Sequence, residues 1–235
     1  MKNIIKKLLI SVAALIFSIN VFAATEQSLL VANNNPHDVE SLQRGARNFM
    51  NYCSGCHSAE YVRYEVIASD LGLSDQQVKE YLMFNAQQTF ETINTSMLEV
   101  DAAGWFGQAP PDLSLMARAK GTDYIYTFLK SFYIDKSSPT GVDNVVLAGT
   151  SMPNVLWELQ GFRDNHGDAY QTSSDGEMTP VQYQQATRDL VAFLDYVGEP
   201  AKLVRYKIGF WVIAFLLVLF LVACMVKKEY WKDVH

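Results

Sequence analysis

Cysteine and histidine are both scarce in this chain of 235 residues, which holds three cysteines and four histidines. Cys53 and Cys56 stand close together, whereas Cys224 lies far away in an apolar run near the C-terminus. A structural zinc site takes four ligands, usually from a second cysteine pair or a spaced pair of histidines. The sequence has neither, so the scarcity argues against zinc.

The sequence also lacks any long strand-like run, any internal repeat and any low-complexity tract. Without such runs no substantial sheet is expected. Helical spacing is present instead in "SLQRGARNFMNY", where Ser41 is the expected N-cap. The apolar residues of this stretch share one helical face: Leu42, Ala46, Phe49 and Met50.

Further helices are expected along the rest of the chain. Ser74 begins a capped helix in "LSDQQVKEYLMF". Asp112, which follows two prolines, is the expected N-cap of a helix through Ala119, and another helix follows. A last amphipathic helix runs from its cap Thr179 to Gly198. The expected fold class is therefore mainly α.

The N-terminus has the three parts of a secretory signal peptide. Three lysines are followed by an apolar run from Leu8 to Phe17 and by small residues at the positions that a signal peptidase reads. These features predict a signal peptide over residues 1–23, cleaved after Ala23. The alternative is an uncleaved membrane anchor, which the short apolar run disfavours.

The segment from Ile208 to Val226 contains no charged residue. At about 1.5 Å per residue, such a helix just spans a hydrocarbon core of about 30 Å. Three lysines follow it, which predicts a cytoplasmic tail. We therefore expect a periplasmic domain over residues 24–204, an anchor helix over 205–227 and a tail over 228–235, in the inner membrane of a bacterium.

Basic residues are fewer than acidic ones between the two ends of the chain. The whole chain has a formal charge of −6, and removing the lysine-rich signal and tail leaves 13 basic and 23 acidic residues, or −10. A surface of this sign repels nucleic acid and attracts a basic partner protein. Plain solubility would explain the same charge.

The motif "CSGCH" places His57 directly after the pair Cys53 and Cys56. A disulfide or a thioredoxin-like dithiol is one reading, but a redox dithiol usually follows a strand, and the residues before this pair predict a helix. Cys-x-x-Cys-His is the attachment signature of c-type haem. The two thiols join the haem vinyl groups, and the histidine then lies under the iron. We expect one covalently bound haem c.

A haem iron with histidine on one side takes a second ligand on the other, and methionine suits electron transfer. Met152 is the preferred candidate, because Gly149 and Pro153 mark a loop and the proline holds the preceding residue extended. The alternatives that remain open are Met178, His166 and His37.

The chain resembles the cytochrome c1 family, the haem subunit of the cytochrome bc1 complex (ubiquinol–cytochrome c reductase). Four features carry the resemblance: "LQRGARNFMNYCSGCHS", "APPDLSLMARAKG", the "SMPN" loop, and an apolar C-terminal segment followed by "KKEYWKDVH". They occur in order across nearly the whole mature chain. The resemblance implies a cytochrome c-type haem domain with long loops and one C-terminal transmembrane helix.

The resemblance also implies roles for individual residues. Haem is expected on the two cysteines, with His57 and Met152 as axial ligands of the iron. A basic residue of the "ARAK" segment is expected to meet a haem propionate. The family more often has arginine where this chain has Lys120, so Arg118 or Lys120 is expected to fill that role.

The implied activity is electron transfer. A Rieske iron–sulfur subunit reduces the haem beside cytochrome b, and a soluble or membrane-bound cytochrome c accepts the electron. The chain is then an electron-transfer subunit of a respiratory enzyme whose quinol oxidation occurs in another subunit. The rival readings are a free-standing anchored electron shuttle, a haem subunit of a terminal oxidase, and an anchored thiol–disulfide protein without haem.

Overall fold

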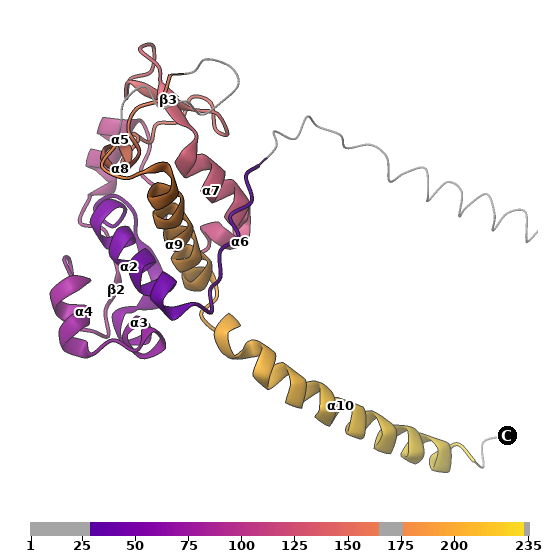
Figure 1. Cartoon of the computed structure of the whole chain (residues 1–235). Helices are drawn as coiled ribbons and strands as arrows, with labels where there is room; N and C mark the ends of the chain where they lie inside the picture. Colours follow the sequence, from indigo (N-terminus) through magenta and orange to yellow (C-terminus); the bar gives the residue numbers. More distant parts are fainter. Residues whose placement is uncertain (1–28, 165–175, 233–235) are drawn as a thin grey trace, which may run out of the picture.

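The computed structural model describes residues 29–164 and 176–232. Figure 1 shows a helical domain from which one long helix, α10, projects. The expected signal peptide, residues 1–23, lies outside the described residues. The mainly helical fold class is confirmed.

Thirteen elements follow one another in the described residues. They are α2 (Val39–Tyr52), β1 (Ala59–Arg63), α3 (Tyr64–Leu71), α4 (Asp75–Tyr81), β2 (Thr92–Ile93), α5 (Glu99–Phe106), α6 (Met116–Lys120), α7 (Thr122–Lys130), β3 (Phe132–Ile134), β4 (Val142–Asn144), α8 (Trp157–Gln160), α9 (Pro180–Gly198) and α10 (Lys202–Tyr230).

Helices α2 and α9 cross at the centre of the domain (Figure 1). The predicted apolar face of α2 is confirmed, since all four of its residues are buried. Gly45 lies at the crossing, where an added Cβ would be only 2.1 Å from the carbonyl oxygen of Asp189. The rings of Phe49 and Phe193 pack beside it with centroids 5.6 Å apart. A residue without a side chain thus lets the two helices approach closely.

A buried carboxylate ties the same two helices together. Asp189 on α9 is 2% exposed and accepts hydrogen bonds from Arg44, Ser41 and Gln185. The ion pair with Arg44 has an N–O distance of 2.6 Å. The prediction of Ser41 as N-cap is therefore wrong. Asp38 caps α2 instead, because α2 begins at Val39 and the Asp38 carboxylate accepts the backbone N–H of Ser41 at 3.2 Å, while the Ser41 hydroxyl donates to Asp189.

The other predicted caps divide into two groups. Ser74 and Thr179 are confirmed, and each forms a capping box with the glutamine three residues later. Asp112 is not an N-cap, because α6 begins only at Met116. Its carboxylate accepts from the backbone N–H of Ser114, 2.8 Å away, and so forms a local turn rather than a helix start.

The strands are too short to be predicted from an alternation of apolar and polar residues. Strands β1 and β2 pair antiparallel, and β3 and β4 form an antiparallel hairpin in which Tyr133 faces Asp143. None of these strands exceeds five residues in the described part of the chain. The hairpin leads directly into the loop that carries Met152.

The helix α10 contains a segment, Ile208–Tyr230, that is long and apolar enough to cross a membrane. Its apolar window is 0% buried against the rest of the protein. Two ion pairs lie at the start of the helix, Lys202 with Asp195 at 3.0 Å and Arg205 with Glu199. They join the end of α9 to the first turns of α10.

Candidate functional site

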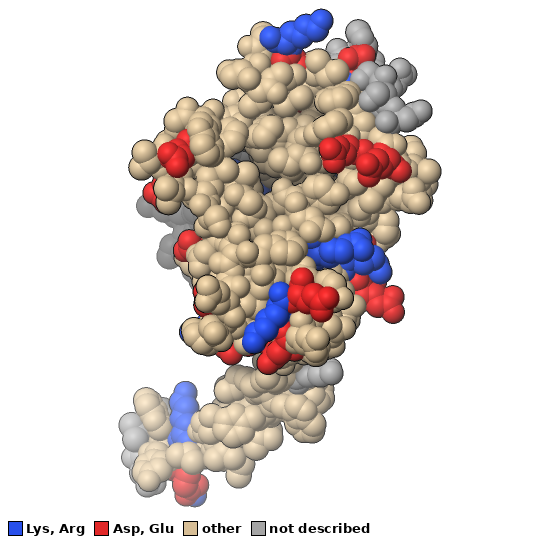
Figure 2. Space-filling model, turned by 90° about the vertical axis from the view of Figure 1, so that its left-hand side faces the viewer, with Lys and Arg blue, Asp and Glu red and all other residues tan. Residues whose placement is uncertain are grey.

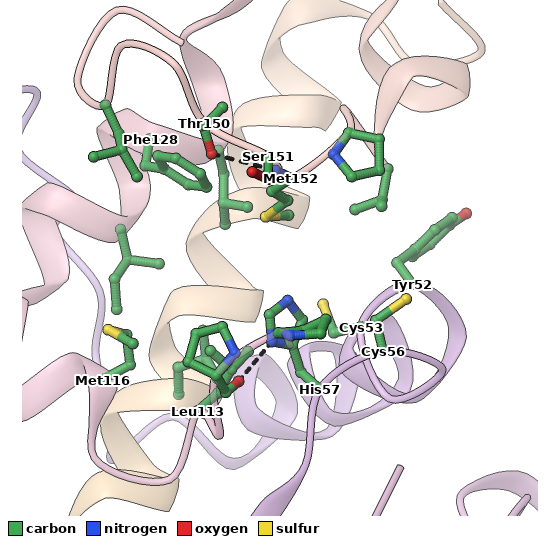
Figure 3. Close-up of a pocket in the computed structure, with 18 of the residues that line it drawn as sticks. Tyr52, Cys53, Cys56, His57, Leu113, Met116, Phe128, Thr150, Ser151 and Met152 are labelled. Carbon is green, nitrogen blue, oxygen red and sulfur yellow. Dashed lines mark hydrogen bonds between the residues drawn. The ribbon is translucent and has the colours of Figure 1, made fainter. Parts of the chain in front are cut away.

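A cavity of about 280 Å³ lies between the end of α2, the loop before α6, helices α7 and α9, and the loop after β4. Most of its wall is apolar, with side chains such as Leu113, Phe128, Leu190 and Leu194. Figure 3 shows the sulfur, imidazole and aromatic groups that reach into it. Apolar walls with a few placed polar groups are typical of cofactor sites.

The end of α2 supplies one wall of this cavity. Cys53 is the C-cap of the helix, and its carbonyl accepts from the backbone N–H groups of Cys56 at 3.0 Å and His57 at 2.8 Å. The chain therefore continues in a tight turn that brings both thiols and the imidazole to one side (Figure 3). Neither cysteine forms a disulfide, and Cys53 is buried and Cys56 half-buried.

The environment of the two thiols disfavours their thiolate forms. Burial, reinforced by the neighbouring Cys56 sulfur, raises the pKa of Cys53 to about 12, and burial also raises the pKa of Cys56. Dithiol exchange requires a thiolate, which proteins obtain by lowering a cysteine pKa, often at a helix N-terminus. This pair lies at a helix C-terminus instead. The site therefore does not favour thiol–disulfide exchange.

The imidazole of His57 is held in one orientation. Its Nδ1 atom lies 2.7 Å from the carbonyl oxygen of Pro111. A carbonyl only accepts, so Nδ1 carries the proton and Nε2 keeps a lone pair. Burial lowers the pKa of His57, although the Pro111 carbonyl and Asp112 act in the opposite direction. The residue is thus a neutral imidazole with Nε2 available as an iron ligand.

The opposite wall is the loop after β4. Figure 3 shows the side chains of Met152 and His57 pointing into the cavity from opposite sides. The backbone N–H of Met152 donates to the hydroxyl of Thr150 at 3.4 Å. Pro153 follows and also lines the cavity. The structure therefore brings together the four residues that the sequence singled out for haem attachment and iron ligation.

The alternative sixth ligands lie elsewhere or outside the described residues. Met178 packs against the core, and its backbone N–H donates to Leu159 at 3.2 Å. His37 is exposed in the turn before α2. Neither lines the cavity. His166 lies outside the described residues.

Lys120 and Arg118, the two candidates for contacting a haem propionate, lie in different places. Lys120 lines the cavity, with its Nζ atom 5.6 Å from the ring centroid of Tyr124. Arg118 instead lies against the end of α9, where a Cβ added to Gly198 would be 3.3 Å from its Cγ atom. Of the two, only Lys120 is placed beside the site.

Some residues of the site were not foreseen. The Pro111 carbonyl that orients His57 is 54 residues away in the chain, and the sequence marks it only as part of a stiff turn. Tyr52 and Thr150 also line the cavity. Tyr124 and Phe128 of α7 line the cavity as well, whereas Phe132, at the start of β3, is buried beyond it.

The donor set fits a haem. Two thiols lie beside a neutral imidazole on one wall, a thioether faces them from the other, and the lining between them is apolar. Histidine and methionine are a ligand pair of electron-transfer haems. A cluster of three or more histidine, cysteine, aspartate or glutamate residues, which would suit a separate metal ion, is absent from the described residues.

The chain is similar to known proteins over most of its length. It is 43% identical to cytochrome c1 of Allochromatium vinosum, over 87% of this chain and 88% of the relative. It is 39% identical to a protein of Nitrosomonas europaea named ammonia monooxygenase gamma subunit, over 84% and 85%, and 30% identical to cytochrome c1 of Rhodospirillum rubrum, over 84% and 83%. Residues 32–99 and 88–234 match the sequence model of the Cytochrome C1 family. The chain belongs to the cytochrome c1 family.

Proposed function

We propose that this protein transfers single electrons through one covalently attached haem c, as the haem subunit of a cytochrome bc1 complex. The observation that carries the proposal is the pairing of His57 with Met152 across an apolar cavity, beside Cys53 and Cys56. Membership of the cytochrome c1 family supports it. When bound, the haem supplies an iron that alternates between two oxidation states.

The residues of the first wall attach and orient the cofactor. Cys53 and Cys56 hold it through their sulfur atoms, on a turn fixed by the Cys53 carbonyl. His57 presents Nε2 because the Pro111 carbonyl holds the opposite side of the ring. No side chain forms or breaks a substrate bond, so no catalytic residue is assigned.

The residues of the second wall set the redox properties. Met152 supplies a thioether, which favours the reduced iron and raises the reduction potential. The apolar lining excludes water and has the same effect, because the oxidised iron carries the additional charge. Lys120 is the residue we assign to a haem propionate, since its side chain lines the cavity.

The proposed partners follow from the family. Cytochrome b and the Rieske iron–sulfur subunit lie beside the protein in the membrane, and a cytochrome c takes the electron. On the face shown in Figure 2, acidic side chains lie in several separate groups among large neutral areas. The formal charge of −10 on the domain favours a basic acceptor and disfavours nucleic acid.

The proposed topology assigns residues 1–23 to a cleaved signal peptide and 24–204 to the periplasm. Residues 205–227 anchor the protein in the inner membrane of a bacterium, and 228–235 lie in the cytoplasm. The apolar segment of α10 supports this assignment. Family membership disfavours the free-standing shuttle and the terminal-oxidase subunit.

The proposed ligand pair is tested with two methionine variants. Met152→Leu should abolish the near-infrared sulfur–iron absorption of the oxidised protein and lower its reduction potential, because the thioether is lost. Met178→Leu is the matched control, since it removes a methionine from the core outside the cavity. Loss of the absorption in the Met178 variant, or its persistence in the Met152 variant, would contradict the assignment.

A further inference from the structure

The loop that carries Met152 is held by two side chains at the end of β4. Asp143 and Asn144 are adjacent in the sequence, and both bond to backbone N–H groups further along the chain. The loop is neither helix nor strand, so its backbone donors need partners of another kind. Aspartate and asparagine are the residues that commonly satisfy such local donors.

Asp143 holds the part of the loop nearest to Met152. Its Oδ1 atom accepts from the backbone N–H of Gly149 at 2.8 Å and of Thr150 at 3.3 Å. It also accepts from the N–H of Asn144 at 2.8 Å. The other carboxylate oxygen accepts from the hydroxyl of Tyr133 at 3.2 Å, on the facing strand. One carboxylate therefore joins the hairpin to the residues just before Met152.

The hydrogen bonds continue from Asp143 to the cavity. Thr150, which is buried, donates its N–H to Asp143 and accepts the N–H of Met152 through its hydroxyl. Gly149 has φ +74°, a conformation that this turn requires and that L side chains rarely adopt. The height of the Met152 sulfur above His57 thus depends on how firmly Asp143 holds this turn.

Asn144 supports the other end of the loop. Its side-chain oxygen accepts from the N–H groups of Val146 at 2.9 Å and Leu147 at 3.3 Å. Its side-chain nitrogen donates to the carbonyl of Phe128 at 2.8 Å, and Phe128 itself lines the cavity. Asn144 is fully buried. The turn that Asp143 holds therefore starts from a point already fixed to α7.

We propose that Asp143 is a positioning residue that holds the Met152 loop against the iron, an inference that rests on the proposed axial role of Met152. Removing the carboxylate releases two loop N–H groups and lets the thioether leave the iron. The variant then exposes an iron site that an added ligand such as imidazole can occupy. A residue that only stabilised the fold would not have this specific effect.

The same hairpin offers a matched control. Asp135 is half-buried like Asp143 and also accepts a backbone N–H, that of Ser137 at 2.8 Å. It accepts the Ser137 hydroxyl at 2.6 Å as well, so its bonds stay within the hairpin turn. Asp135→Ala removes one negative charge and one local carboxylate without touching the Met152 loop.

The test uses the haem-loaded, full-length protein in detergent, with the wild type and the variants Asp143→Ala, Asp143→Asn, Asp143→Glu and Asp135→Ala. The readouts are the sulfur–iron absorption, the reduction potential and imidazole affinity. Asp143→Ala should weaken the absorption and bind imidazole about tenfold more tightly, which corresponds to about 1.4 kcal/mol. That is the scale of one lost hydrogen bond to a charged group.

The direction in which the reduction potential changes distinguishes a displaced Met152 loop from the mere loss of a negative charge. Removing a negative charge alone disfavours the oxidised iron and raises the potential, whereas losing the thioether lowers it. We expect a lower potential for Asp143→Ala. Asp143→Asn, which keeps an acceptor oxygen, and Asp135→Ala should keep the sulfur–iron absorption and the imidazole affinity of the wild type, and their potentials should not fall. Asp143→Glu keeps the charge but displaces the oxygen, so its imidazole affinity should lie between those of the wild type and Asp143→Ala.

The outcomes distinguish this inference from the ligand assignment. If the wild type itself lacks the sulfur–iron absorption, the axial role of Met152 is wrong and the inference falls with it. If the wild type has it and each of Asp143→Ala and Asp143→Glu that retains haem binds imidazole as the wild type does, the positioning role is overturned. It is overturned equally if neither Asp143→Ala nor Asp143→Glu retains haem, because the residue then serves folding in general.

Discussion

At the scale of single residues, Gly45 sets the distance between the two central helices. We predict that Gly45→Ala destabilises the protein by about 1–3 kcal/mol, because the new Cβ would lie 2.1 Å from the Asp189 carbonyl oxygen and 2.7 Å from the Phe193 Cβ. The free energy of unfolding of the haem-loaded protein, from denaturant titration, measures this. Gly104→Ala is the control, since an added Cβ there meets nothing within 4 Å, and it should be neutral or slightly stabilising. Equal effects of the two substitutions would refute the argument.

Individual residues also show what the sequence reveals about a site. Cys53, Cys56 and His57 form a contiguous motif, and Pro153 marks the Met152 loop, so all four proposed haem contacts could be named in advance. The contact of His57 with Pro111 could not, because it joins segments 54 residues apart. Side chains whose chemistry is local are predictable, whereas backbone partners depend on the tertiary fold.

At the scale of elements, helix α9 depends on its N-terminal cap. Thr179→Ala removes the side chain that accepts the N–H of Gln182 and should cost about 1 kcal/mol of stability. The helix packs against α2, α6 and α7, so this loss should appear in global unfolding followed by circular dichroism. The haem content should not change.

The matched variant is Ser74→Ala, which removes the equivalent cap from α4. Helix α4 packs mainly on α3, so the loss there should raise amide exchange in α4 more than it lowers global stability. If the two variants lower global stability equally, the central role of α9 is not supported.

The caps also show where local sequence reasoning succeeds and fails. The caps Ser74 and Thr179 are predictable, because both halves of each capping box lie within three residues. The prediction that Ser41 is the cap was wrong, and its hydroxyl instead donates to Asp189, a partner 148 residues away. The short strands escaped prediction for a different reason, since strands of two to five residues carry too little alternation to stand out.

At the scale of the whole molecule, we predict that the domain ending at Pro200 and the apolar helix are separable. A chain ending after Pro200 should be soluble, since the apolar window of α10 is 0% buried against the domain. Its haem should remain on the polypeptide in acid–acetone, because Cys53 and Cys56 precede the cut. Cells that carry only this form should lose quinol–cytochrome c reductase activity. An absorption spectrum and a membrane activity assay measure these outcomes.

An unrelated membrane span attached after Pro200 serves as the control. If it restores full activity, the native helix is only a tether. If the cut chain alone retains full activity, the protein is not a subunit of the proposed complex. Colour that extracts into the acid–acetone would contradict covalent attachment.

The crossing of α2 and α9 has a consequence for the order of assembly. The thiol of Cys53 follows directly after α2 and is buried in the finished fold. The helix that completes this core, α9, begins only at Pro180. A chain exported from its N-terminus, as in the proposed topology, would present its thiols long before the core can close. Contacts so distant in sequence form late in folding. If the thiols carry haem as proposed, attachment therefore occurs on the open chain, and a protein that closes its core first is no longer a precursor for attachment.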